Sequence, residues 1–111
     1  MAALAVAASL VAPAAAAELV MFRTAGCPYC AAWDAAIGPI YPKTDIGKRV
    51  PLRQVDLERS KDGKVVLVSP IRFTPTFVLV DSGREIGRLE GYPGEDFFWG
   101  LLERLLLHHR L

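Results

Sequence analysis

The sequence predicts a small α/β domain in which a central, mixed four-stranded sheet is flanked by helices. Four short segments are apolar or alternate between apolar and polar residues, and turn-forming residues bound them. Two other segments have apolar residues at the spacing of a helix. One follows the first of the four segments, and the other lies at the C-terminal end. Asp81-Ser82-Gly83-Arg84 joins the last two strands as a hairpin, so the sheet contains an antiparallel pair.

The N-terminal segment differs in composition from the rest of the 111 residues. Residues 1–17 contain ten Ala, two Leu, two Val and one Met, and no charged residue. We interpret them as a secretory signal peptide, with an apolar run at 2–11, a break at Pro13 and a cleavage site at Ala15-Ala16-Ala17. An Ala-rich tail is the alternative. The interpretation makes residues 18–111 an exported domain without a stable membrane anchor, since the apolar run is too short to span a bilayer.

The charge balance excludes two further classes of protein. Thirteen basic and twelve acidic residues leave a net charge of +1, so the chain lacks the basic surface that nucleic-acid binding requires. An apolar content of 52% with so little net charge also argues against intrinsic disorder.

The first strand and helix adjoin the two cysteines. Residues 18–24 are mostly apolar and predict a strand that ends before Ala25-Gly26. Pro28 suits the first turn of a helix, which we expect to run to about residue 37. Gly38-Pro39 then breaks or kinks this helix, and it can resume through residues 40–48.

The remaining elements follow the same logic. Residues 51–57, 76–80 and 85–91 predict strands. Residues 64–69 are ambiguous, because they are β-branched yet lie where a crossover helix between parallel strands belongs. The last helix opens at residues 93–96, and its apolar residues repeat at intervals of three and four: Phe97, Phe98, Leu101, Leu102, Leu105 and Leu106.

Cys27 and Cys30 are the only cysteines, and they lie three residues apart. A structural zinc site needs four ligands, whereas the two histidines, His108 and His109, are at the far end of the chain. A disulfide that closes so short a loop contributes little stability. The pair therefore predicts redox chemistry without a metal or organic cofactor.

The position of Cys27 indicates how the pair would react. We expect Cys27 at a strand-to-helix junction, where free backbone N–H groups and the helix dipole lower the pKa of its thiol. Cys30 lies one turn further into the helix and should be less exposed. Cys27 is thus the predicted nucleophile, and Cys30 the residue that resolves the mixed disulfide.

Thr74-Pro75 precedes a strong apolar strand. A trans proline at a strand start and a cis proline packed beside Cys27 are equally compatible with the spacing alone.

Taken together, Cys27-Pro28-Tyr29-Cys30, Thr74-Pro75 and Gly91 resemble the thioredoxin fold family over residues 18–107. The resemblance implies a thioredoxin-like fold, a cis Pro75, and a Thr74 backbone that binds the substrate peptide. The segments 40–45, 72–77 and 90–99 resemble, more narrowly, exported thioredoxin-like proteins of bacterial sulfur-oxidation gene clusters.

Some positions depart from the family pattern. Gly26 stands where ordinary thioredoxins have Trp, and Met21 stands where they have a buried Asp that relays a proton. Pro28-Tyr29 between the cysteines is typical of glutaredoxins, as is Thr74 before the proline. The glycine- and aspartate-containing segment that holds glutathione in glutaredoxins is not evident.

Aromatic residues complete the predicted site. Gly26, Pro28, Tyr29, Thr74 and Pro75 are the candidate substrate-binding residues. Tyr29 should be exposed, and with Phe73, Pro75 and Tyr92 it could form an apolar docking patch for a partner peptide. Trp33 and Trp99 are better explained as packing residues.

The sequence therefore predicts a monomeric periplasmic thiol–disulfide oxidoreductase of a bacterium. The resemblance implies that it reduces a partner protein, such as a sulfur-oxidation component, with electrons from a membrane donor. Two alternatives stay open: a glutaredoxin-like enzyme that uses glutathione, and a module that binds Cu(I) through its thiols.

Overall fold

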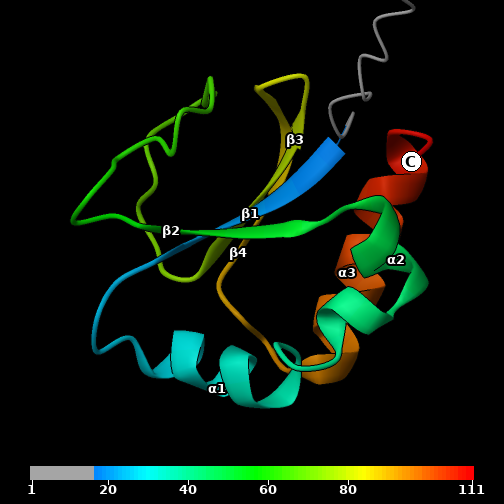
Figure 1. Cartoon of the computed structure of the whole chain (residues 1–111), viewed down its shortest axis with the longest axis horizontal. Coiled ribbons are helices and arrows are strands. Elements are labelled where there is room, and N and C mark those ends of the chain that lie inside the picture. Colours follow the sequence, from blue (N-terminus) through cyan, green and yellow to red (C-terminus); the bar gives the residue numbers. More distant parts are fainter. Residues whose placement is uncertain (1–16) are drawn as a thin grey trace, which may run out of the picture.

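A computed structural model describes residues 17–111 (Figure 1). Its strands are β1 (Ala17–Arg23), β2 (Leu52–Asp56), β3 (Thr76–Asp81) and β4 (Arg84–Glu90). They form one sheet in the order β2-β1-β3-β4. β1 pairs with β2 in parallel and with β3 antiparallel, and β3 and β4 form the antiparallel hairpin. The predicted mixed four-stranded sheet is thus confirmed.

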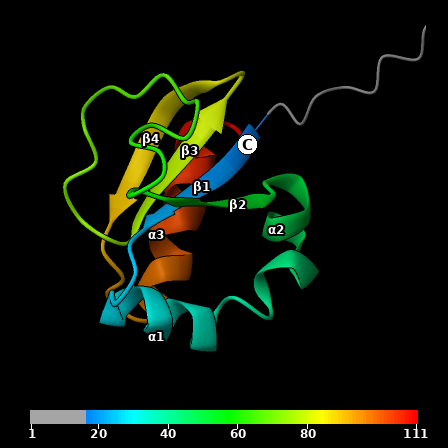
Figure 2. The ribbon, with the colours of Figure 1, turned by 60° about the vertical axis from the view of Figure 1, so that its left-hand side comes forward.

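The helices are α1 (Pro28–Ala36), the 3-10 helix η1 (Tyr41–Lys43), α2 (Asp45–Arg49) and α3 (Glu95–His108). They pack against one face of the sheet, where they enclose the larger hydrophobic core (Figure 2). That core contains alternate residues of the central strands, such as Leu19 and Phe77, together with Trp33 and Leu102 from the helices. As expected, Trp33 is fully buried.

The helix after the cysteines does not resume at residue 40 as one segment. Thr44 caps α2, because its Oγ1 accepts a hydrogen bond from the N–H of Gly47 at 2.9 Å. Tyr41 begins the preceding piece, η1, and ties it to the end of α2: its ring is buried and its hydroxyl donates to the carbonyl of Val50 at 2.6 Å. The local N-cap thus ends one helical segment and starts another.

The opposite face of the sheet is covered by the long connection of residues 57–75 rather than by a crossover helix. The helical alternative for residues 64–69 was wrong. β2 and β3 run in opposite directions, so the chain needs no crossover between them. Val65 packs against the sheet, and Val66 forms an isolated parallel bridge with Arg84.

The predicted signal peptide lies outside the described residues, except for Ala17, which begins β1 and pairs with Asp81. Across residues 17–111, no helix is both long and apolar enough to cross a membrane.

Candidate functional site

Cys27 and Cys30 form a disulfide at the N-terminus of α1. Cys27 is the N-cap residue, and its sulfur accepts a hydrogen bond from the N–H of Cys30 at 3.1 Å. Cys27 is half-buried, whereas Cys30 is fully buried within the larger core. The two sulfurs therefore occupy different environments, with one open to a partner and the other enclosed.

The loop between β1 and α1 presents Cys27 just beyond the C-terminal end of a central strand. Gly26 has a φ of +75°, a backbone conformation that residues with a Cβ rarely adopt. Thr24, in the same loop, shares a hydrogen bond of 3.3 Å between its Oγ1 and that of Thr74. This contact ties the cysteine loop to the segment that carries the proline.

The Thr74–Pro75 peptide bond is cis, in agreement with the resemblance. Two hydrogen bonds hold this segment: the Gly91 N–H donates to the Pro75 carbonyl at 2.7 Å, and the Thr76 hydroxyl donates to the Phe73 carbonyl at 2.6 Å. Among the hydrogen bonds of residues 17–111, none uses the N–H or carbonyl of Thr74. These two groups are thus available to an added strand.

A groove of about 430 Å³ lies beside this segment. Its lining is mainly aromatic and apolar, and it includes Tyr29 from α1 and Tyr92 and Pro93 from the loop before α3. Tyr29 is 62% exposed, as expected, and Phe73 is 58% exposed. The remaining lining residues are Thr74, Glu90 and Gly91.

Three of the four residues predicted to form a docking patch line this groove. Pro75 is not among the lining residues, because it is buried. Its contribution is therefore to set the path of the Thr74 backbone.

A second cleft, of about 390 Å³, opens on Cys27 from the side of β2. Gly26, Pro28 and Arg23 line it, and Arg23 makes a two-pronged ion pair with Asp34 of α1, at 2.7 and 2.8 Å. The hydrogen bonds that Arg23 donates to Asp34 raise the pKa of the guanidinium. The ion pair thus fastens the end of β1 to α1 close to the disulfide.

The Arg23–Asp34 pair was absent from the sequence prediction. The two residues are eleven positions apart and belong to different elements. The only sequence signal for this ion pair would have been the position of Asp34 in the helix, which puts it on the side of α1 that faces β1.

Met21 is fully buried in the larger core, which also contains Cys30. A thioether neither donates nor accepts a proton at neutral pH. Met21 therefore cannot relay the proton of Cys30.

On the face of the sheet opposite the helices, an ion pair between Glu85 and Arg88 holds the chain a few residues before the cis peptide bond. Glu85 is buried and accepts hydrogen bonds from Arg88 and from the Val68 N–H, while Arg88 also donates to the carbonyls of Ser69 and Pro70. Burial acts to raise the pKa of Glu85, but the bonds from Arg88 and Val68 outweigh it and lower the pKa. The pair thus holds residues 68–70 against β4, just before the cis peptide.

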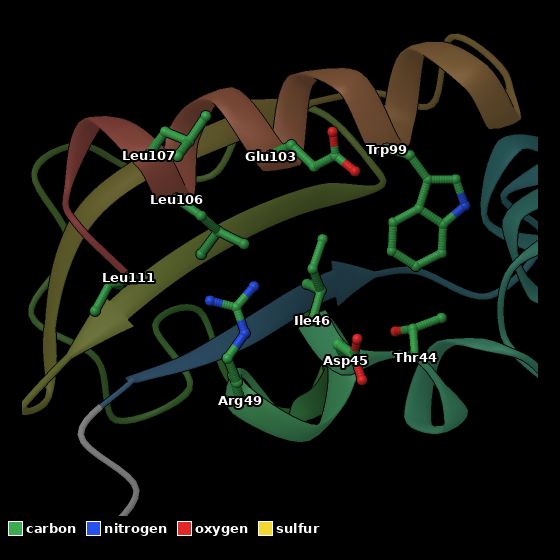
Figure 3. Close-up of a pocket in the computed structure, with 9 residues that line it drawn as sticks. All are labelled: Thr44, Asp45, Ile46, Arg49, Trp99, Glu103, Leu106, Leu107 and Leu111. Carbon is green, nitrogen blue, oxygen red and sulfur yellow. The ribbon is translucent and has the colours of Figure 1, made fainter.

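A larger cavity, of about 590 Å³, lies between α2 and α3 (Figure 3). Ile46, Trp99, Glu103 and Leu106 are among its lining residues, and neither cysteine is. Trp99 packs as expected, with its ring stacked on that of Tyr41. Over residues 17–111, no group of three or more His, Cys, Asp or Glu side chains could hold a metal ion.

Comparison with known proteins gives a consistent result. A family model described as a thioredoxin-like domain matches residues 4–106. The structure is similar to that of the periplasmic thioredoxin SoxS from Paracoccus pantotrophus in its reduced form, with 50% identity and a TM-score of 0.77. That match covers 81% of this chain and 95% of SoxS.

More distant structures share the fold alone. Thioredoxin from Fasciola hepatica is 19% identical, with a TM-score of 0.55, and 79% of each chain is covered. Thioredoxin f2 from Chlamydomonas reinhardtii is 15% identical, with a TM-score of 0.57, over 80% of this chain and 78% of that one. No curated protein matches.

Proposed function

Since the chain belongs to the thioredoxin-like family, we propose that it reduces a disulfide of a partner protein in the periplasm, through Cys27 and Cys30. It is a thiol–disulfide oxidoreductase. The observation that carries the proposal is the contrast between the half-buried Cys27 at the helix N-cap and the fully buried Cys30. The first can meet a partner disulfide, and the second can meet only Cys27.

The reaction starts from the reduced pair. The thiolate of Cys27 attacks one sulfur of the partner disulfide, the partner S–S bond breaks, and the leaving thiolate takes a proton from water. Cys30 then attacks the sulfur of Cys27, and the proton of its thiol passes to the partner thiolate that leaves. The mixed disulfide breaks, the second partner thiol is released, and the Cys27–Cys30 disulfide forms. Two electrons pass from this chain to the partner.

The backbone at the helix start favours the first step. The Cys30 N–H that bonds to the Cys27 sulfur, together with the N-terminus of α1, stabilises a negative charge on that sulfur. This lowers the pKa of the Cys27 thiol.

The partner segment would bind as an added strand. The free N–H and carbonyl of Thr74 supply the main-chain hydrogen bonds, and the groove beside Tyr29 takes apolar side chains. Gly26 and Pro28 flank Cys27 and leave its sulfur accessible.

Two observations support a periplasmic location: the composition of the N-terminal segment, interpreted as a signal peptide, and the similarity to periplasmic SoxS. We expect an exported monomer whose partner belongs to a bacterial sulfur-oxidation system, with a membrane protein as the electron donor. The donor is needed because each turnover leaves the pair oxidised.

Glutathione is expected to bind weakly in this groove, so it is a less suitable reductant for this chain than a membrane protein. Glutathione carries two carboxylates, and the only charged side chain among the lining residues is that of Glu90. Like charges in one groove oppose binding. A requirement for glutathione in turnover would favour the glutaredoxin-like alternative, and copper retention without disulfide reduction would favour the Cu(I)-binding one.

The test is capture of the partner by a Cys30→Ser variant. Without Cys30 the mixed disulfide at Cys27 cannot be resolved, so the partner should stay covalently attached in periplasmic extracts and be released by dithiothreitol. Cys27→Ser is the matched control and should capture nothing. If both variants reduce insulin as well as the unsubstituted chain does, the proposal is wrong.

A further inference from the structure

The docking groove is apolar along most of its length. Tyr29, Phe73, Tyr92 and Pro93 supply its ring surfaces, and the first two are more than half exposed. Exposed aromatic side chains at a functional groove favour contact with apolar groups of a partner. Apolar contacts alone, however, would select little among partner sequences.

The groove has a charged residue on one side only, where β4 ends. Glu90, at the end of β4, is the single charged residue that lines it. Glu95 and Asp96 follow in the first turn of α3. Burial and the Glu95 carboxylate both raise the pKa of Tyr92, a lining residue of the groove. Along the chain, Tyr92 thus has acidic residues on both sides, Glu90 before it and Glu95 after it.

The basic residues nearest in the sequence do not line the groove. Arg72 precedes Phe73 but is exposed and does not line the groove. Arg88, on β4, is bound to Glu85 and to the carbonyls of Ser69 and Pro70 on the opposite face of the sheet. Its bonds to Glu85 raise its pKa most, and the charge of Glu90 adds to this, so Arg88 offsets part of the Glu90 charge without lining the groove.

The sheet register places Glu90 beside the proposed strand-binding site. Glu90 lies opposite Thr76, and the next residue, Gly91, donates its N–H to the Pro75 carbonyl. A segment paired with Thr74 lies one strand spacing from it, roughly 5 Å, and β4 lies one spacing from residues 75 and 76 on the other side. The added segment is therefore about two spacings, roughly 10 Å, from the backbone of Glu90, a distance that a long side chain such as lysine can span together with that of Glu90.

We infer that Glu90 makes this groove selective for a partner segment that carries a lysine or arginine beside its reacting cysteine, together with apolar residues. This inference rests on the proposed function and adds the chemistry of the partner to it. An opposite charge on the partner speeds encounter and a like charge slows it, and both effects weaken in salt.

The experiment compares three capped peptides that differ only in having lysine, glutamine or glutamate on both sides of a single cysteine. The cysteine is joined through a disulfide to 2-mercaptoethanol, which carries no charge. The chain is first reduced, and release of the peptide thiol is followed in a single turnover by acid quench and chromatography. Each rate is divided by that for dithiothreitol, which removes the effect of lysine on intrinsic disulfide reactivity.

We expect the lysine peptide to react about tenfold faster than the glutamate peptide at low ionic strength, with glutamine between them. The ratio should fall in about 0.5 M sodium chloride, where the Debye length is roughly 4 Å and charges further apart than this attract each other much less. Glu90→Gln should reduce the ratio to about twofold. Glu103→Gln removes the same charge from the separate cavity of Figure 3 and should leave the ratio unchanged.

Equal rates for the three peptides, or a ratio that Glu90→Gln does not alter, would overturn the charge selectivity and leave the proposed reductase function intact. If dithiothreitol reduces all three peptides and the reduced chain reduces none, both the selectivity and the proposed function are wrong.

Discussion

Single-cysteine variants allow the reactivity of the two thiols to be compared directly. In Cys30→Ser, the sulfur of Cys27 keeps its position at the N-cap of α1. The group that donates a hydrogen bond to this sulfur is the backbone N–H of residue 30, so the substitution retains that bond. In Cys27→Ser, the remaining thiol is that of the fully buried Cys30.

The size of the effect follows from the contacts of Cys27. A hydrogen bond to a charged group contributes about 1.5–3 kcal/mol, and a helix N-terminus adds about 0.3–1 kcal/mol. Together they stabilise the thiolate by about 2–4 kcal/mol, which lowers the pKa of the thiol and raises its ionisation constant at least about 30-fold. The gain in rate at pH 7 is smaller, since the ionised fraction saturates and a less basic thiolate is a weaker nucleophile.

The assay is alkylation by iodoacetamide across a range of pH. In the folded chains we expect Cys27 to react at least about 100-fold faster than Cys30, because Cys30 is both buried and less ionised. In concentrated urea the two rates should become nearly equal. The pH midpoint for Cys27 should be lower in the folded chain than in urea.

Two results would refute this reasoning. One is a rate ratio below about tenfold in the folded variants, which would mean that Cys30 is accessible. The other is a pH midpoint for Cys27 that does not change on unfolding, which would mean that the helix N-terminus does not stabilise its thiolate.

Replacing Tyr29 and Phe73 together by alanine should lower kcat/KM for insulin disulfides about tenfold, while the free energy of unfolding changes by less than about 0.5 kcal/mol because both side chains are exposed; unchanged turnover would contradict the docking role. Glu85→Gln should lower the free energy of unfolding in urea by about 2 kcal/mol at pH 7, because it leaves Arg88 without its buried partner. Burial alone would raise the pKa of Glu85, but the bonds from Arg88 outweigh it, so the pKa in the folded chain is lowered. The stability that the ion pair contributes is therefore present above the pKa of Glu85 in the unfolded chain, and it is lost as the pH falls through the pKa in the folded chain. The gap between Glu85→Gln and the unsubstituted chain should therefore close in acid, and a gap that stays constant with pH would exclude the ion pair as its cause. Met21→Asp buries a carboxyl group without a partner and should cost about 3 kcal/mol or more in the same urea assay; native-like stability would show that residue 21 is not enclosed.

Local signals predicted most of the elements and the reactive pair. Pro28 directly after Cys27 favours a helix start, and the apolar residues before Gly26 favour a strand, so the cysteine had to lie at their junction. The hairpin and the last helix followed from a turn motif and from apolar spacing in the same way. Each of these signals acts within a few residues along the chain, and the sequence contains it in full.

The connection of residues 57–75 could not be predicted in this way. Its β-branched residues fit either a strand or a buried helix, and the choice depended on the directions of β2 and β3. Those directions follow from how the sheet assembles, which no local pattern encodes.

The docking groove depends on the tertiary structure for the same reason. Tyr29, Phe73 and Tyr92 are separated by many residues, and they line one groove because β3 lies between β1 and β4 in the sheet. Glu90 looks like an ordinary solvated residue in the sequence, and only the register of β4 brings it to the groove. Packing between distant segments is settled when the whole core closes. The chain by itself therefore predicted the chemistry of the cysteines and the aromatic residues beside them, whereas the burial of Pro75 and the place of Glu90 at the groove were decided only by the tertiary structure.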